Sequence, residues 1–358
     1  MTIADLRRFA IARSLHTSTT LKRAVGSLNF VQADPIRAPA RAQDLILHQR
    51  VIDYRAGDLE RRYVNLKLEE DYFINYGFVT NAVHNLMHPR SGMPPWPKEP
   101  KKLSQKILEF VHERGAVHPR EVNDHFAHGS TRNYWGGTSN ATTHLLDAMH
   151  FRGILRVAGR ARGIRIYTAR EPAEENDDDP DTRIDALIDV VVNQYAPLHQ
   201  ASLANFVSRL RFCVPQWHCH LRSALGRAKQ RLAHAHVDGV EWYWPDGERP
   251  RPSEPRQEVR LLAPFDPIVW DRRRFELFWG WAYRFEAYTP VSKRKLGYYA
   301  LPLLWRDRVI GWANVAADNA ELRAHIGYVE SLPASDRTFQ QALESELERM
   351  RVFLGLKT

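Results

Sequence analysis

The hydrophobic pattern is clearest between residues 101 and 170. Apolar positions recur at helical spacing over the first stretch, Pro119 begins a second helix, and a third helix is predicted over 139–152. Two strand-like segments follow, at 155–158 and 164–168, and the turn between them contains glycines that can adopt positive φ. Three helices followed by a hairpin is the element order of a winged helix, so we predict one here. The apolar stripe of the first helix consists of Leu103, Ile107, Phe110 and Val111.

The same element order recurs between residues 183 and 246. An amphipathic helix, a second helix over 203–210 and a basic third helix over 215–230 precede a predicted hairpin with Asp238-Gly239 at its turn. Residues 1–90 contain two helices of the same type and a weaker hairpin pattern, and we assign them to the same class. The apolar stripes of these helices are Ile184, Leu187, Ile188 and Val191, then Ile3, Leu6 and Phe9, and then Leu21, Val25 and Leu28.

Residues 257–358 have a different pattern. Segments rich in β-branched and aromatic residues, bounded by turn residues, predict a small antiparallel sheet or barrel. An amphipathic helix over 334–354 is predicted to close the chain. The strand-like segments are 259–270, 284–290, 297–305 and 309–317, and the apolar face of the helix consists of Phe339, Leu343, Leu347 and Met350.

Together these patterns predict an α+β fold of three tandem winged-helix domains followed by a small antiparallel β-barrel-like domain with a C-terminal helix. Segments that are rich in proline or in acidic residues separate the blocks and are interpreted as exposed linkers. The linkers are 88–102, 171–181 and 248–256. The predicted domains are 1–90, 101–170, 183–246 and 257–358.

Charge adds a class of partner to this picture. The chain carries 51 Lys plus Arg against 42 Asp plus Glu, a net charge of +9. Such a charge is compatible with a polyanionic partner such as nucleic acid, but a basic enzyme can have it too, so other features must decide between the two. The two cysteines exclude a disulfide framework and favour a reducing compartment. The first fifteen residues are amphipathic rather than signal-like, and no run of about 18 apolar residues predicts a membrane span. We therefore expect a cytoplasmic protein.

The segment from Phe30 to Val51 holds the candidate chemistry. In an extended chain, residues two apart project to the same side, so Gln32 and Asp34 can face one point in space. Pro35 disfavours the helical region for Asp34. An amide and a carboxylate that converge could hold a water molecule, which the amide orients and the carboxylate deprotonates. By spacing alone, the more common arrangement is structural, with Asp34 as the N-cap of a helix that begins at Pro35.

The same segment resembles the signature of the YcaQ- and AlkZ-like DNA glycosylases, which act on alkylated purines and interstrand crosslinks. Members show Gln-x-Gln or Gln-x-Asp, then Pro and an Arg-Ala-x-x-Leu-x-Leu segment. The Asp in this chain resembles the YcaQ branch, which accepts a range of alkylated bases, whereas Gln43 and Asp44 depart from the histidine that relatives often carry there. The matching positions are Gln32, Asp34, Pro35, Arg41, Ala42, Leu45 and Leu47, and the resemblance continues through Trp135-Gly136, 261–280 and 288–305.

The resemblance implies hydrolysis of the N-glycosidic bond of an N7-alkylated purine in double-stranded DNA, with Gln32 and Asp34 as the catalytic residues. Such a base already carries positive charge, so a carboxylate is needed only to stabilise the oxocarbenium-like sugar and to position water. No metal and no nucleotide cofactor is required, and we expect a monomer. A crosslinked base is tied to the opposite strand, so a shallow site beside the duplex is expected instead of base flipping.

Basic residues in three regions are expected to contact the DNA backbone. They are Arg37, Arg41 and Arg50 near the site, Arg160, Arg162 and Arg165 on the predicted hairpin, and Lys293, Arg294 and Lys295 in the C-terminal block. Two other functions fit the same sequence. One is a non-catalytic winged-helix DNA-binding or regulatory protein, and the other is a small-molecule enzyme hosted by the C-terminal block.

Other groups of residues are interpreted as structural. One predicted helix contains cysteine and histidine residues, which are the residue types that bind zinc. Their spacing does not suit a zinc site, because Cys219 and His220 are adjacent and no CxxC pair exists. Phosphate-binding, serine-hydrolase and zinc-protease motifs are absent from the sequence. Aromatic residues in strands usually fill cores. For this reason we expect core positions rather than stacking platforms for Tyr288, Pro290, Tyr298 and Tyr299.

Overall fold

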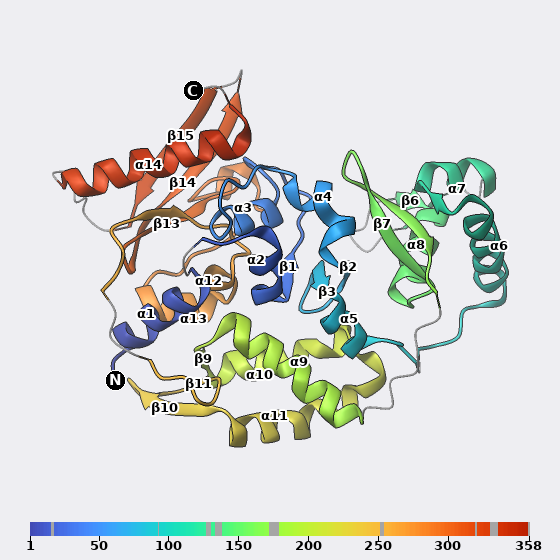
Figure 1. The fold of residues 1–358 in the computed structure, drawn as a ribbon, viewed down its shortest axis with the longest axis horizontal. Coiled ribbons are helices and arrows are strands. Elements are labelled where there is room, and N and C mark those ends of the chain that lie inside the picture. Colours follow the sequence, from blue (N-terminus) through green and yellow to red (C-terminus); the bar gives the residue numbers. More distant parts are fainter. Residues whose placement is uncertain are drawn as a thin grey trace.

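The computed structural model describes residues 1–15, 18–91, 93–126, 130–132, 138–171, 179–250, 254–318, 321–329 and 336–356. The fold is α+β, with several small antiparallel sheets. Figure 1 shows most of the N-terminal block in the middle of the molecule, with the second block on one side of it, the third block below it and the C-terminal sheet on the other side.

The N-terminal block supplies the centre of the molecule. Its three-stranded antiparallel sheet has the order β1-β3-β2, so the weakly predicted hairpin is present. Thr2, Thr20 and Thr80 accept hydrogen bonds from the first turns of three of its helices, which fixes where these helices begin. The elements are α1 (Ile3–Ser14), α2 (Leu21–Leu28), β1 (Phe30–Gln32), α3 (Ala42–His48), α4 (Asp58–Arg62), η1 (Tyr63–Leu66), β2 (Leu68–Tyr72), β3 (Tyr76–Thr80) and α5 (Asn81–Met87).

The second block has the helices and the hairpin that its sequence predicts, and its main sheet has the order β4-β8-β7. Trp135 and Gly136, which carry part of the family resemblance, lie outside the described residues. The elements are α6 (Lys98–Arg114), β4 (Ala116–Val117), α7 (Pro119–Phe126), β5 (Ser130–Arg132), β6 (Thr138–Asn140), α8 (Ala141–Phe151), β7 (Leu155–Ala161) and β8 (Ile164–Ala169).

The third block also contains a three-stranded sheet, of order β10-β11-β9. The helix predicted over 215–230 is shorter than expected, because residues Pro215–His220 form a kinked 3-10 turn and the α-helix begins only at Leu221. The elements are α9 (Pro180–Tyr195), β9 (Leu198–His199), α10 (Gln200–Arg209), η2 (Leu210–Phe212), η3 (Pro215–His220), α11 (Leu221–Arg231), β10 (Ala233–Val237) and β11 (Val240–Trp244).

The C-terminal block corrects two predictions. Its strands form an open sheet of order β12-β13-β14-β15, so no closed barrel forms among the described residues. The second half of the segment predicted as a strand over 259–270 is helical, because Asp266 caps a helix whose first residue is Pro267. The predicted strand at 284–290 is irregular. The elements are β12 (Val259–Leu261), α12 (Pro267–Trp270), α13 (Arg272–Trp279), η4 (Val291–Lys293), β13 (Leu301–Trp305), β14 (Arg308–Asp318), β15 (Glu321–Tyr328) and α14 (Arg337–Leu354).

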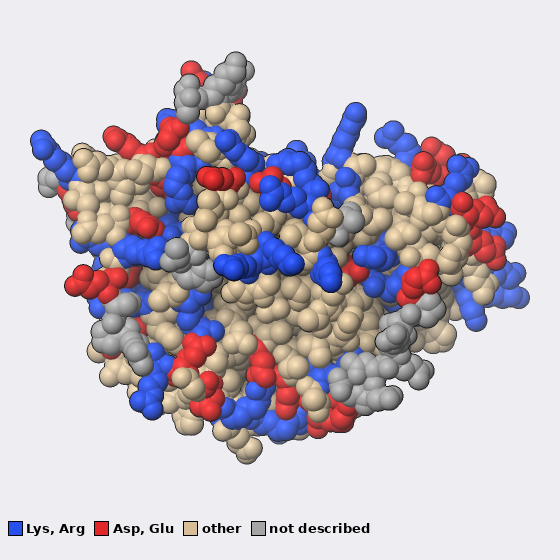
Figure 2. Space-filling model, viewed as in Figure 1, with Lys and Arg blue, Asp and Glu red and all other residues tan. Residues whose placement is uncertain are grey.

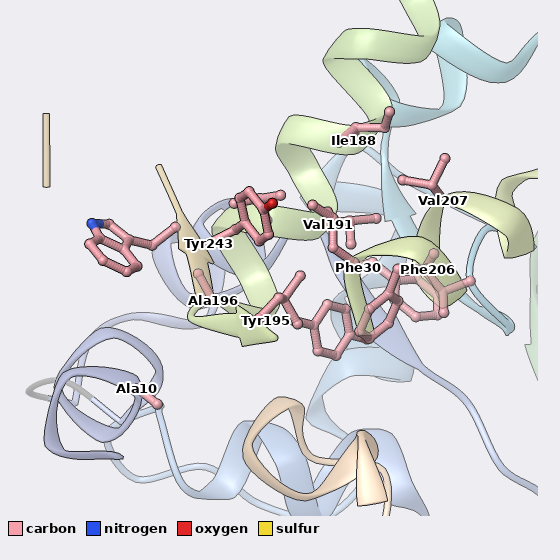
Figure 3. Close-up of a cluster of buried hydrophobic side chains, with 14 of the residues drawn as sticks. Ala10, Phe30, Ile188, Val191, Tyr195, Ala196, Phe206, Val207 and Tyr243 are labelled. Carbon is pink, nitrogen blue, oxygen red and sulfur yellow. The ribbon is translucent and has the colours of Figure 1, made fainter. Parts of the chain in front are cut away.

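Three hydrophobic cores hold these blocks together. One core joins α1 and Phe30 to the third block and to α12 and α13, and Figure 3 shows Phe30 together with Val191, Tyr195 and Phe206 of the α9–α10 pair. A second core joins α2 and α3 to the C-terminal sheet and α14. Among the residues that the structure describes, the third core lies within the second block alone. The winged-helix assignment and the four domain boundaries stay predictions, but the blocks are not independent in their packing.

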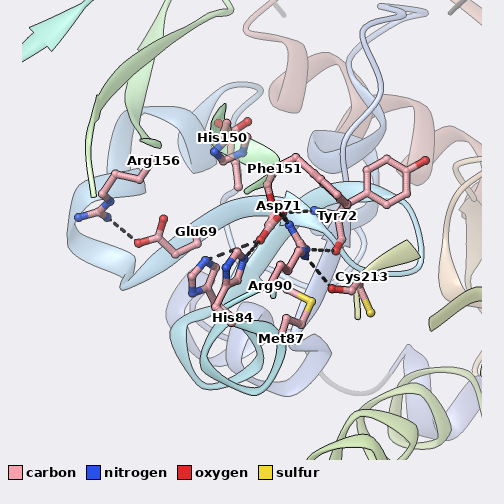
Figure 4. Close-up of polar contacts among 12 residues, drawn as sticks. Glu69, Asp71, Tyr72, His84, Met87, Arg90, His150, Phe151, Arg156 and Cys213 are labelled. Carbon is pink, nitrogen blue, oxygen red and sulfur yellow. Dashed lines mark hydrogen bonds and ion pairs between the residues drawn. The ribbon is translucent and has the colours of Figure 1, made fainter. Parts of the chain in front are cut away.

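A buried arginine links three of the blocks. Arg90 donates to the carboxylate of Asp71 at 2.9 Å, to the carbonyl oxygen of Phe151 at 2.7 Å and to that of Cys213 at 2.7 Å, as Figure 4 shows. Its guanidinium also lies 4.3 Å from the centre of the Phe151 ring. Burial alone would raise the pKa of Asp71, but Arg90 and then His88 more than offset burial and hold that pKa well below its usual range.

We expect His48 to make folding stability fall in acid. Its ring is buried and stacks on Phe353 at 4.4 Å, and burial, followed by Arg349 and Arg260, lowers the pKa of His48 to about 3. The unfolded chain binds a proton at this residue with a pKa near 6.5, so stability is full above pH 6.5 and is lost as the pH falls toward 3. Between pH 7.5 and 5.5 this single group should cost about 1.4 kcal/mol.

The measurement is urea unfolding at both pH values. The His48→Leu variant should show a fall in unfolding free energy that is smaller than the wild-type fall by about that amount. The Phe353→Leu variant is the control, because it removes the stacking partner and keeps the titrating ring. An equal pH dependence in wild type and His48→Leu would contradict the expectation.

Candidate active site

Gln32 is the last residue of β1, and the pleat of this strand separates the side chains as the sequence predicts. Val31 and Ala33 pack on the core shared with the C-terminal sheet, whereas Gln32 projects to the other side. Gln32 is opposite Gly77 in the antiparallel register. A Cβ at Gly77 would lie 2.4 Å from the carbonyl oxygen of Val31, so this close pairing requires glycine. The strand therefore holds the backbone of Gln32 rigidly.

The side chain of Gln32 is buried, with 3% of its surface exposed. Its Oε1 accepts a hydrogen bond of 2.7 Å from Nε1 of Trp270, at the end of α12. Trp270 is a site residue that the sequence did not point to, since its segment was expected to be a strand. The available signal was Asp266-Pro267, a pair typical of a helix start.

Asp34 is half-buried and lies just before the first bend after β1, which is at Pro35. One carboxylate oxygen accepts a 2.9 Å hydrogen bond from the backbone N–H of Ile36, and the N–H of Asp34 itself donates to Oε1 of Gln43 at 3.4 Å. Burial raises the pKa of Asp34, and the bond from Ile36 opposes this shift. The alternative in which Asp34 caps a helix is wrong, because the next helix begins at Ala42 with Arg41 as its N-cap.

Asp34 lines a groove of about 710 Å³ between the first and second blocks. The first block contributes the segment Ala33–Pro35, Arg41 and Tyr76, and the second contributes residues of α7, α8 and the β7–β8 hairpin. Gln32 does not line this groove, so the two predicted catalytic residues differ in exposure, and no hydrogen bond joins them among the described residues. The arginines that line the groove are Arg41, Arg120, Arg160 and Arg165.

Three of the predicted DNA-contacting arginines line this groove but already have partners. Arg41 pairs with Glu60, Arg160 pairs with Glu70 through two contacts of 2.6 and 2.8 Å, and Arg165 pairs with Asp147 at 2.9 Å. The guanidinium of Arg41 also lies directly against Gly163, at the tip of the hairpin, where any Cβ would overlap it. The contacts of Arg41 and Arg160 fix the hairpin against the first block, and the ion pairs leave all three arginines partly neutralised.

Arg50 corrects the prediction that it contacts DNA. Only 1% of it is exposed, and its guanidinium makes two hydrogen bonds to Asp266, of 2.7 and 2.9 Å. It also donates to the carbonyl oxygen of Ile46 and to the hydroxyl of Ser14. Because Asp266 caps α12, Arg50 anchors the helix that carries Trp270. Gln43 and Asp44 are also buried, so neither faces DNA.

The remaining predicted DNA contacts lie at the surface. Arg37, Arg162, Lys293 and Lys295 are exposed and have no ion pair among the residues that the structure describes. Arg294 is partly covered and donates to the carbonyl oxygen of Thr289. In Figure 2, Lys and Arg side chains project at the tip of the β7–β8 hairpin and form a row across the middle of this face.

Two tyrosines correct the expectation of core positions. Tyr288 is 73% exposed and Tyr298 is 44% exposed, whereas Tyr299 is buried as predicted. Burial, and then the charge of Asp34, raises the pKa of both Tyr288 and Tyr299, which places these rings near the carboxylate. The exposed ring of Tyr288 therefore lies in the vicinity of Asp34.

One group of described residues has the spacing of metal ligands. The ligand-type atoms of Asp71, His84 and His88 lie within 4.8 Å of one another. The two imidazoles, however, stack in parallel at 4.1 Å, so their nitrogen lone pairs do not converge, and Asp71 is already bonded to His88 at 2.7 Å and to Arg90. A buried guanidinium beside the carboxylate also disfavours a divalent cation. We interpret this cluster as an ion-pair network.

None of the described helices combines the length and the apolar character needed to cross a membrane. The comparisons with known proteins agree with the fold. The chain is similar over 99% of its length to Streptomyces sahachiroi DNA glycosylase AlkZ, of which it covers 97%, with a TM-score of 0.65 and 16% sequence identity. At this identity the likeness shows the fold alone. Residues 25–353 match the model of the family described as DNA glycosylase AlkZ-like, and the chain therefore belongs to the AlkZ-like family of DNA glycosylases.

Proposed function

We propose that this chain is a monofunctional DNA glycosylase that hydrolyses the N-glycosidic bond of N7-alkylated purines, with Asp34 and Gln32 as its catalytic residues. The observation that carries the proposal is the position of Asp34, a half-buried carboxylate at the wall of a groove between two blocks that four arginines line. Family membership supplies the reaction class. We further propose that the protein acts as a monomer in the cytoplasm.

The chemistry suits a carboxylate without a separate acid. An N7-alkylated purine carries a positive charge on its ring, so the leaving base does not need a proton. Asp34 accepts the proton of the attacking water and stabilises the positive charge that develops on the sugar. The raised pKa of Asp34 supports the role of base, since its carboxylate is more basic than that of an exposed aspartate.

The substrate range is proposed from the second motif position. With Asp34 at this position, the motif resembles the Gln-x-Asp pattern of the YcaQ branch. We therefore expect the protein to process a range of alkylated bases, including bases tied into interstrand crosslinks. Asp34 lies on the groove wall rather than in the protein core. Such a position is compatible with a base that cannot be rotated far from its duplex.

DNA affinity should depend on the exposed lysines of the segment 293–295. The double variant Lys293→Ala/Lys295→Ala removes two surface cations, so it should weaken binding equally for all duplex sequences and reduce the slope of log Kobs against log salt by about two. The measurement is fluorescence anisotropy over a series of salt concentrations. Arg222→Ala/Lys229→Ala on α11, which lies on the lower side of the molecule, is the matched control (Figure 1). An unchanged salt slope in the first variant would contradict a DNA contact there.

The proposed function is tested with the wild-type protein. Duplexes that contain one N7-methylguanine or one nitrogen-mustard crosslink are incubated with the protein, free base is measured by chromatography, and abasic sites are cleaved with alkali. Release of the alkylated base is expected. Salt-sensitive binding without release would support the non-catalytic DNA-binding alternative. Absence of salt-sensitive DNA affinity would support a small-molecule enzyme instead.

A further inference from the structure

The hydrogen bond between Trp270 and Gln32 determines which end of the amide is available. An indole N–H can only donate, so the atom of Gln32 that faces it at 2.7 Å must be the carbonyl oxygen. The amide nitrogen then points away from Trp270. Among the described residues this nitrogen has no hydrogen-bond partner, and it is not one of the side-chain atoms that are sealed from solvent. Gln32 can therefore offer its N–H groups to a ligand, while Trp270 occupies one lone pair of its oxygen.

Trp270 is itself held on several sides. Its ring stacks on Phe206 at 4.9 Å with an interplanar angle of 27°, and the guanidinium of Arg209 lies 5.2 Å from its centre. The helix α12 that carries it is fixed at its other end by the buried Arg50–Asp266 pair. With its ring and its helix both fixed, Trp270 can donate in only one direction. This rigidity is what a residue needs to set the orientation of another side chain.

We propose that Trp270 is a positioning residue that fixes Gln32 as a hydrogen-bond donor at the reacting centre. This inference rests on the proposed glycosylase function and deepens it. It assigns a polarity to Gln32 that the sequence left open, because a free glutamine can donate or accept. It also assigns a role to the Arg50–Asp266 pair, which supports the helix of Trp270 instead of contacting DNA.

The polarity of Gln32 fits the hydrolysis step. One lone pair of the attacking water accepts a hydrogen bond from an N–H of Gln32, and the other lone pair forms the new bond to C1′ of the sugar. The C1′–N9 bond breaks with its electron pair moving to the base, which neutralises the positive ring. The water loses one proton to the carboxylate of Asp34. Atoms and charges then balance without any other reactant, and the product sugar carries a hydroxyl group.

A double-mutant cycle tests the proposal. Trp270→Phe keeps an aromatic ring but loses the N–H, so it should lower kcat for release of N7-methylguanine about 10- to 100-fold, with KM nearly unchanged. In a Gln32→Ala background, Trp270→Phe should cause little further loss, because the residue that it positions is gone. Equal losses in the two backgrounds, or wild-type kcat in Trp270→Phe, would overturn the proposal.

A second variant tests the polarity alone. Gln32→Glu keeps an oxygen to accept from Trp270 and replaces the N–H groups by oxygen, so base release should be lost while the variant still unfolds in one cooperative thermal transition. Activity in Gln32→Glu would overturn the donor role. Absence of base release by the wild type would overturn the proposed function itself. An inactive Asp34→Asn variant together with a fully active Trp270→Phe variant would overturn only the positioning role.

Discussion

Replacing Asp34 by asparagine is expected to slow the release of N7-methylguanine by about 10²- to 10⁴-fold. Asparagine has nearly the same shape but cannot take the proton of water and cannot stabilise a cationic sugar. The half-buried position at the groove wall makes this loss large, since bulk water does not replace the missing charge. The rate is measured under single-turnover conditions with excess protein, which separates the chemical step from binding.

Binding and pH dependence distinguish this outcome from general damage. The affinity of Asp34→Asn for an undamaged duplex should equal that of the wild type or exceed it, because a negative charge is removed from the groove. Asp124→Asn is the matched control, since Asp124 lies on α7, on the opposite wall of the same groove, and should keep a near wild-type rate. Because burial raises the pKa of Asp34, the wild-type rate should begin to fall in acid above the ordinary range of an aspartate. A fast Asp34→Asn variant would contradict the assignment.

Replacing Arg90 by methionine is expected to lower the free energy of unfolding by about 3–5 kcal/mol. The substitution leaves the buried carboxylate of Asp71 without its guanidinium partner and the carbonyl oxygens of Phe151 and Cys213 without a donor. The pKa of Asp71 should rise as a result, so the variant should lose stability with a different pH dependence from the wild type. Urea unfolding followed by tryptophan fluorescence measures the change.

Two further variants test whether the loss of stability comes from the buried ion pair. Arg222→Met, on the exposed face of α11, should change stability by no more than about 0.5 kcal/mol. Asp71→Asn/Arg90→Met should be less destabilised than the sum of the two single variants, because the double variant has no unpaired buried charge. Additive losses would show that the ion pair is not the source of the effect.

The local part of the fold could be predicted from the sequence. The helices and hairpin of the second block follow from apolar spacing and glycines that lie close together in the chain, so their positions were predicted well. The prediction of a strand around Trp270 was wrong. The apolar and aromatic residues of this segment match a strand, whereas the helix depends on a single side chain, that of Asp266, which caps it.

The long-range part of the site could not be predicted. The partner of Arg50 lies 216 positions away and that of Gln32 lies 238 positions away, and no local pattern distinguishes a surface arginine from one that will be buried against a distant carboxylate. The exposure of Tyr288 has a similar cause. Its segment is irregular rather than a strand, so the usual association of aromatic residues with sheet cores does not apply there.

The shared cores affect how the chain folds during synthesis. The ribosome releases α2 and α3 early, yet the strands and helix that cover them come from residues 259–353. The N-terminal region, with the strand that carries Gln32, must therefore remain incompletely packed until residues 259–353 have been translated, whereas residues 107–167 can close their own core well before that. Any stall late in translation would leave a folded middle and an exposed apolar beginning, which is the form of this protein that chaperones would have to protect.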